Sequence, residues 1–152
     1  MYAEGHAAHG VASGTEFDWP TLPAAGGPLD LGVARQPDPP RWELTYATRL
    51  SGGWLAVTDP DGSGFGVAFD ERVFPVVWVW GVWGGWRGLY TLAVEPWTAW
   101  PAKLDEVIAA GRQRTLGPGE TLETELRYVA YEGMAAVSGI HGDGRVSGEA
   151  KE

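Results

Sequence analysis

Alternating apolar and polar positions dominate the middle of the chain and predict β-strands. Strand-like runs cover residues 42–50, 54–58 and 64–69, and clusters of Gly, Asp and Pro separate them. Two further runs, 73–80 and 89–95, follow at a spacing typical of sandwich and barrel proteins. The pattern therefore predicts an all-β fold, an antiparallel β-sandwich.

Two later segments differ from these runs: one has apolar residues at helical spacing, and the other alternates more strictly. Residues 101–111 have apolar side chains at helical spacing, with Pro101 in the first turn and Gly111 as a stop, so we expect one short helix there. Residues 121–130 show the clearest alternation of all, which predicts a strand with one buried face and one wet face.

Composition divides the chain into three parts. Residues 1–40 are rich in Pro and Gly, which predicts an irregular N-terminal segment. Residues 41–133 are expected to form the β-sandwich core. Residues 134–152 are small, Gly-rich and charged, and a flexible C-terminal tail is predicted for them.

Length and charge narrow the class of protein. A chain of 152 residues is long enough for one domain with a real core. Its 11 basic and 20 acidic residues give a net charge of −9, which argues against nucleic acid or an anionic membrane surface as a partner. No apolar run is long enough for a membrane span, and the first residues do not resemble a secretory signal, so a cytoplasmic location is expected.

Residues with metal or redox chemistry are scarce. The chain has no cysteine, which excludes disulfides and thiolate metal sites. Its three histidines, His6, His9 and His141, have no recognised metal-ligand spacing with an acidic residue, so we expect neither a metal nor another cofactor.

The nine tryptophans suggest a ligand class, because sugar C–H faces pack on indole rings while sugar hydroxyls bond to polar groups around them. We expect Trp42, Trp54 and Trp78 to belong to the core. The indoles expected to contact a ligand lie on a Gly-interrupted segment: Trp80, Trp83 and Trp86.

Glu95 is the acidic residue whose position favours chemistry. It ends a predicted apolar strand and is followed directly by Pro96 and Trp97. A carboxylate among tryptophans is suited to act as a general base. The alternative is a structural role, in which backbone N–H groups or Arg87 satisfy the carboxylate.

Three segments together carry a resemblance to a known family. Residues Leu89–Thr98, Leu116–Glu120 and Tyr128–Tyr131 resemble the C-terminal part of the aldose 1-epimerases and their galactose mutarotase-like relatives. The upstream segments Phe74–Trp80 and Gly14–Pro20 are similar to the same superfamily.

The resemblance implies roles for individual residues. Glu95 matches the general base that removes the proton of the anomeric hydroxyl. The segment Gly5–Gly10 resembles the family's short His-x-x-aromatic motif, which places His6 as the acid that protonates the ring oxygen. Ring opening and reclosure would then interconvert the anomers of a monosaccharide. The residues expected to contact the sugar are Trp80, Trp83, Trp86, Trp97, Arg87 and Asp30.

The chain departs from the family in length, since family members are much longer and their N-terminal half supplies much of the sugar pocket. We therefore expect uncovered sheet edges, which a homo-oligomer or a complementing partner chain would cover. The main alternative function is a carbohydrate-binding or interaction module on the same β-scaffold without catalysis. A remnant with no ligand is the third possibility.

Overall fold

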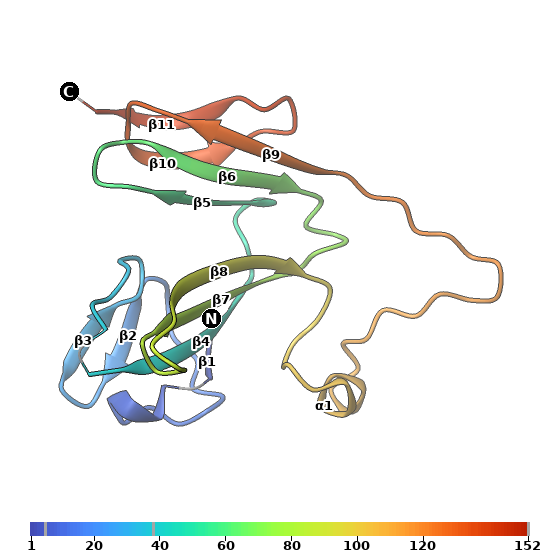
Figure 1. Cartoon of the computed structure of the whole chain (residues 1–152). Helices are drawn as coiled ribbons and strands as arrows, with labels where there is room; N and C mark the ends of the chain where they lie inside the picture. Colours follow the sequence, from blue (N-terminus) through green and yellow to red (C-terminus); the bar gives the residue numbers. More distant parts are fainter. Residues whose placement is uncertain (5, 38, 152) are drawn as a thin grey trace.

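The computed structural model describes residues 1–4, 6–37 and 39–151, and it confirms the all-β prediction (Figure 1). The strands pair in antiparallel sheets, as alternating sequences with short turns favour. The strands are β1 (Tyr2–Glu4), β2 (Thr21–Ala24), β3 (Gly27–Asp30), β4 (Arg41–Thr48), β5 (Trp54–Thr58), β6 (Gly64–Phe69), β7 (Val76–Trp83), β8 (Tyr90–Trp97), β9 (Leu126–Tyr131), β10 (Met134–Ile140) and β11 (Val146–Ala150). The helices of the described residues are the 3-10 turn η1 (Ala7–His9) and α1 (Leu104–Ala109), which lies inside the predicted helical segment.

A four-stranded sheet in the order β1-β4-β7-β8 forms the lower layer of Figure 1. Strand β7 lies inside this sheet, and its sequence is apolar on both faces. It begins at Val76 and not at the predicted residue 73, because Pro75 cannot donate a ladder hydrogen bond. Pairing with β4 then continues to Trp83.

A three-stranded sheet in the order β5-β6-β9 forms the upper layer, and the hairpin β10–β11 lies beside it. The close approach of this hairpin is visible at Gly66, where an added Cβ would lie 2.7 Å from the Ile140 side chain. In Figure 1, β5 is the strand of the upper layer nearest to the lower layer.

The two layers share an apolar core. Ala47 and Val77 contribute from the lower sheet, and Leu55, Val67 and Phe69 contribute from the upper sheet. A second cluster packs β2 and β3 against β1, and its buried members are Ala3, Val11, Phe17 and Leu22.

Both terminal segments are more regular than predicted. The N-terminal residues 1–40 contain three strands and a 3-10 turn instead of a wholly irregular path. The predicted tail, 134–152, forms the hairpin β10–β11 over its described residues. The hairpins β2–β3 and β10–β11 are ordered by packing against other segments, since Leu22 is buried in the N-terminal cluster and Ile140 packs beside β6.

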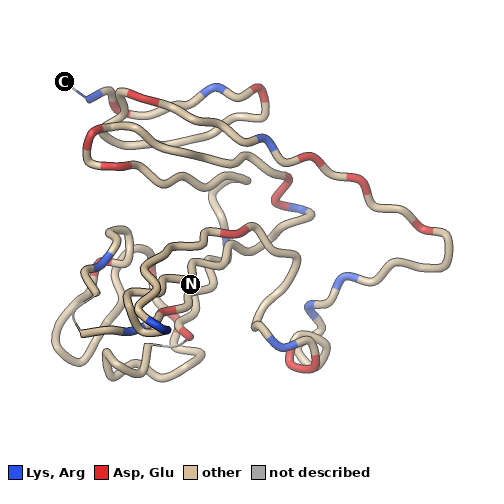
Figure 2. The backbone as a smooth tube through the Cα atoms, in the orientation of Figure 1, with Lys and Arg blue, Asp and Glu red and all other residues tan. Residues whose placement is uncertain are grey.

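The strongest alternation in the sequence produced a shorter strand than expected. Strand β9 begins only at Leu126, and residues 121–125 are extended and exposed without a strand partner. Tyr128, an apolar position of that alternation, is 64% exposed. Figure 2 marks acidic positions in red along the segment before β9, which loops away from both layers.

None of the helices in the described residues is long and apolar enough to cross a membrane.

Candidate functional site

The register of the four-stranded sheet assigns its residues to two opposite faces. Thr45 lies opposite Val79, whereas Tyr46 lies opposite Trp78, which in turn lies opposite Glu95. Since paired residues share a face and successive residues alternate, Thr45 and Glu95 project from opposite sides. We call the side of Thr45, which faces the upper layer, the cleft face, and the side of Glu95 the indole face.

Tryptophans lie along the indole face, and two of them, Trp78 and Trp97, adjoin Glu95. Trp42, Trp80 and Trp97 are 46%, 38% and 42% exposed. Trp78 stacks on Trp97 with ring centroids 4.5 Å apart and planes within 19°. The Trp97 Nε1–H group donates to Glu95 Oε2 over 3.3 Å, which fixes one carboxylate oxygen. The expectation that Trp42 belongs to the core is wrong, because its end of β4 is open to solvent, whereas Tyr46 on the same face is buried.

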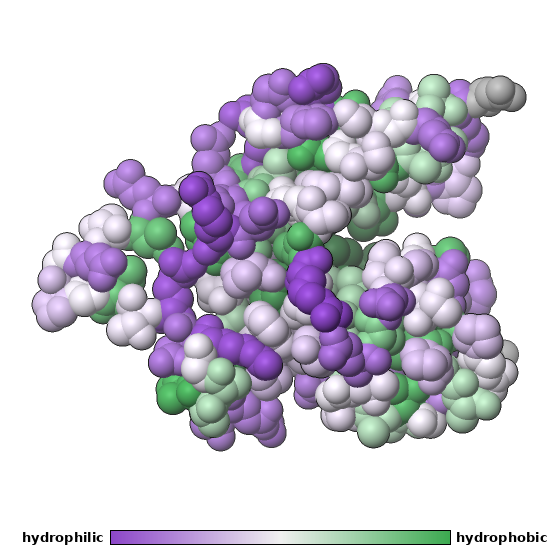
Figure 3. All heavy atoms as spheres, turned by 180° about the vertical axis from the view of Figure 1, so that it is seen from behind, coloured by the Kyte–Doolittle hydropathy of each residue, from purple (hydrophilic) through white to green (hydrophobic). Residues whose placement is uncertain are grey.

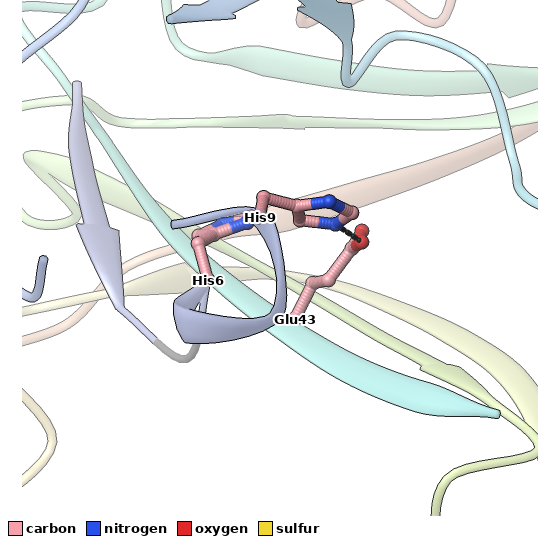
Figure 4. A group of neighbouring side chains, drawn as sticks. All are labelled: His6, His9 and Glu43. Carbon is pink, nitrogen blue, oxygen red and sulfur yellow. Dashed lines mark hydrogen bonds and ion pairs between the residues drawn. The ribbon is translucent and has the colours of Figure 1, made fainter. Parts of the chain in front are cut away.

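A buried carboxylate, Glu43, lies on the cleft face among four polar side chains, and Figure 4 shows it beside two histidines. Glu43, on β4, is 6% exposed. Its Oε1 atom lies 2.6 Å from His9 Nε2 and 3.3 Å from Arg41 Nε. Its Oε2 atom accepts from Arg35 Nε at 3.1 Å and from Trp83 Nε1 at 3.0 Å. We call these five residues the Glu43 cluster.

The surroundings of Glu43 keep it ionised. Burial by itself raises the pKa of a carboxyl group. Here the hydrogen bonds from His9 and Trp83, together with the Arg35 guanidinium, outweigh burial and hold the pKa of Glu43 below its ordinary value. The cluster therefore contains one carboxylate and two guanidinium groups, so it carries an excess of positive charge.

His6 is buried beside this cluster. Its side chain is 1% exposed, and its Nε2 atom shares a hydrogen bond of 2.9 Å with Thr45 Oγ1. Its Nδ1 atom is also buried and has no hydrogen-bond partner among the described residues. Burial lowers the pKa of His6, and the opposing attraction of Glu43 is smaller. The imidazole is therefore neutral at pH 7.

The three side chains His6, His9 and Glu43 offer ligand atoms within 4.8 Å of one another. Two histidines and a carboxylate form a donor set that suits zinc. However, the guanidinium groups of Arg35 and Arg41 contact the same carboxylate, at 3.1 and 3.3 Å. A dication would add its charge to a buried site that is already positive, so we assign no metal here.

The two residues expected to act as base and acid lie apart. Glu95 projects from the indole face, whereas His6 contacts Thr45 on the cleft face. A sugar on either face could therefore reach only one of them. The expected Glu95–His6 pair does not exist within one chain of this structure. Gly5, which begins the segment resembling the family's His motif, lies outside the described residues.

The expected sugar contacts are likewise divided. Trp80 and Trp97 share the indole face with Glu95, but Trp83 is buried against Glu43 on the cleft face. Trp86 is exposed in the loop between β7 and β8, where the Arg87 guanidinium lies 5.5 Å from its ring centroid. Asp30 serves the turn after β3, since its Oδ1 accepts from the Gly32 N–H group.

Sequence reasoning missed the residues of the Glu43 cluster other than Trp83. A carboxylate on the strand 42–50 was a possible signal, but alternation places Glu43 on the more polar side of that strand and so suggests exposure. The contacts of Glu43 with His9 and Arg35 span 34 and 8 residues, and no local pattern indicates either.

Comparison with known proteins gives no match: no family model, no curated protein and no solved structure is similar to this chain.

Acid is expected to destabilise the fold through His6. Because burial lowers its folded pKa below 6.5, the unfolded chain binds this proton more readily than the folded chain. The contribution of neutral His6 to the free energy of unfolding is therefore complete above pH 6.5. It is lost as the pH falls below that value, and the free energy of unfolding then drops by up to about 1.4 kcal/mol per pH unit. Glu43 lowers the free energy of unfolding further at more acidic pH, once the pH falls below the ordinary pKa of a Glu carboxyl group.

Urea unfolding between pH 8 and pH 5 measures this slope. His6→Gln should flatten it, whereas His141→Gln, in the hairpin beside the upper sheet, should leave it in place. An unchanged slope in His6→Gln would assign the acid sensitivity to another group.

Proposed function

We propose that this chain binds a monosaccharide or a related carbohydrate on the indole face. The observation that carries the proposal is the exposed row of indoles, Trp42, Trp80 and Trp97, on the same sheet face as the Glu95 carboxylate. Indole rings pack on the C–H faces of a pyranose, and a carboxylate accepts hydrogen bonds from its hydroxyl groups. Charged side chains alone bond to water as readily as to sugar hydroxyl groups, so the indole rings provide the preference for a sugar.

Glu95 suits the role of hydroxyl acceptor. Its Oε2 atom is oriented by the Trp97 indole N–H group, which leaves Oε1 available for a ligand. Trp78 and Trp80 are two residues apart on β7, a spacing of about 7 Å along the strand. The face therefore offers adjacent aromatic surfaces beside one oriented carboxylate.

Interconversion of sugar anomers, as in an aldose 1-epimerase, is the second candidate function. The position of Glu95 beside exposed indoles favours it, because a base must contact the anomeric hydroxyl. His6 cannot supply the acid to the same sugar, since it lies behind the sheet. A second copy or a partner chain that covers the indole face would supply this group, so we propose that catalysis requires an assembly.

Binding is tested by titrating glucose and galactose while recording tryptophan fluorescence. We expect a saturable change that Trp80→Ala and Trp97→Ala each weaken about tenfold, the effect of losing one aromatic contact surface. Trp86→Ala is the matched control, because this exposed indole lies in the loop between β7 and β8. Absence of saturation with both sugars would refute a sugar site of this type.

Catalysis is tested by following anomer exchange of freshly dissolved α-glucose by polarimetry at several protein concentrations. An aldose 1-epimerase activity predicts exchange faster than buffer that is lost in Glu95→Gln and retained in Glu125→Gln. A rate rising more steeply than protein concentration would identify an assembly as the active species. Saturable binding without acceleration would leave the chain as a carbohydrate-binding module.

A further inference from the structure

A long apolar cleft runs between the two layers, on the side of the lower sheet opposite the indole face. It consists of two adjoining hollows of about 540 and 480 Å³. The hollows share the wall residues Trp19, Gly32, Ala56, Thr58, Val79 and Val94. Figure 3 shows hydrophobic atoms lining the gap between the layers.

The middle of this cleft is lined by apolar side chains from both layers. Val79, Leu92 and Val94 line it from the lower sheet, and Ala56 and Val57 line it from the upper sheet. These side chains cannot bond to hydroxyl groups, and burying hydroxyls without partners is costly. An apolar chain or ring, by contrast, would gain free energy by leaving water for this cleft.

One end of the cleft is cationic. Arg35 lines it, with a side chain that is 13% exposed. Its Nε and Nη2 atoms bond to Glu43 and to the Asp30 carbonyl group, which leaves Nη1 without a partner in the described part of the chain. Arg41 also contacts Glu43, so this end has one more positive charge than negative, in a chain whose net charge is −9.

His6 lines the same end of the cleft, and its Nε2 atom shares a hydrogen bond with Thr45 Oγ1. Protein atoms cover its Nδ1 atom, so this nitrogen does not face the cleft. The neutral imidazole therefore adds no charge at this end, and Arg35 is the group that a ligand would meet.

We propose that the cleft binds an amphipathic carboxylate, with its apolar body between the two layers and its carboxylate group at Arg35. The apolar walls and the excess positive charge at one end match the two halves of such a molecule. Asp59, which also lines this hollow, is exposed, so water screens its repulsion. The site lies on the opposite side of the sheet from the proposed sugar site and does not depend on it.

Decanoate and decanol are suitable probes, since they share an apolar chain and differ in charge. Calorimetry on the full chain, below the micellar concentration, should give decanoate an affinity at least about tenfold above that of decanol. Arg35→Gln should remove this preference and leave decanol binding within about twofold. Arg127→Gln, on exposed β9, is the matched control and should behave like the unaltered chain.

A second variant tests the cleft without altering its charged end. Val94→Phe adds bulk to a wall residue shared by both hollows, and it should weaken both probes at least about tenfold. Circular dichroism establishes that each variant is folded before its affinity is compared. Glucose at saturating concentration should not displace decanoate, which separates this site from the indole face.

Three results would overturn the proposal. Equal affinities for decanoate and decanol would show that the charged end contributes nothing. Decanoate binding that survives Val94→Phe would place the ligand elsewhere, and no measurable binding of either probe would mean that the cleft takes no such ligand.

Discussion

Glu43→Ala is expected to lower the free energy of unfolding by about 3–5 kcal/mol, the usual cost of removing one partner from a buried ion pair. The substitution leaves the guanidinium groups of Arg35 and Arg41 close together without the carboxylate between them. It also removes the acceptor for the buried Trp83 N–H group. Urea unfolding at pH 7.5 measures the loss.

Glu125→Ala is the control for this substitution. Glu125 also pairs with an arginine, Arg127, at 2.7 Å, but both side chains are largely exposed. Exposed pairs contribute between about 0 and 1 kcal/mol, so only a small change is expected. If both variants lost equally little stability, the Glu43 cluster would not be the buried network that the structure shows.

Leu55→Ala is expected to cost about 2–5 kcal/mol, the range for deleting a buried leucine side chain. Leu55 belongs to the upper sheet but packs in the core shared with Ala47 and Val77 of the lower sheet. The substitution therefore weakens the contact between the layers as well as the upper sheet itself. Thermal unfolding followed by circular dichroism and by tryptophan fluorescence measures the effect.

Val57→Ala is the matched control, since it lies on the same strand and is exposed. It should cost about 1 kcal/mol or less. If the shared core couples the layers, both probes should report one transition at the same temperature in the unaltered chain. Two separate transitions would contradict this coupling, and Leu55→Ala would then destabilise the upper layer alone.

Local patterns were sufficient for the central strands and the helix. Strands β5 and β6 have the predicted bounds, and β4 and β8 differ from the predicted runs by at most two residues at either end. Alternation and turn residues act over a few positions, so a single sequence contains this information. The helix α1 follows from the same kind of local spacing.

The terminal hairpins could not be predicted in the same way. Strands β2 and β3 pair Pro23 with Pro28, residues that ordinarily argue against a strand. They form because Leu22 is completely buried in the N-terminal cluster, a contact that brings together residues distant in the sequence. The proline and glycine content of this segment does not indicate that Leu22 becomes buried.

The sequence by itself determined that the chain forms antiparallel strands with two distinct faces, and it singled out Glu95 and the tryptophans now found around it. Only the tertiary structure decided which face is covered. On β4 the apolar side is open to solvent at Trp42 and covered at Tyr46, while Glu43, on the more polar side, is buried. Alternation defines two faces of a strand, but packing against other segments selects the buried one. That selection separates Glu95 from His6 and encloses Glu43 with its distant partners.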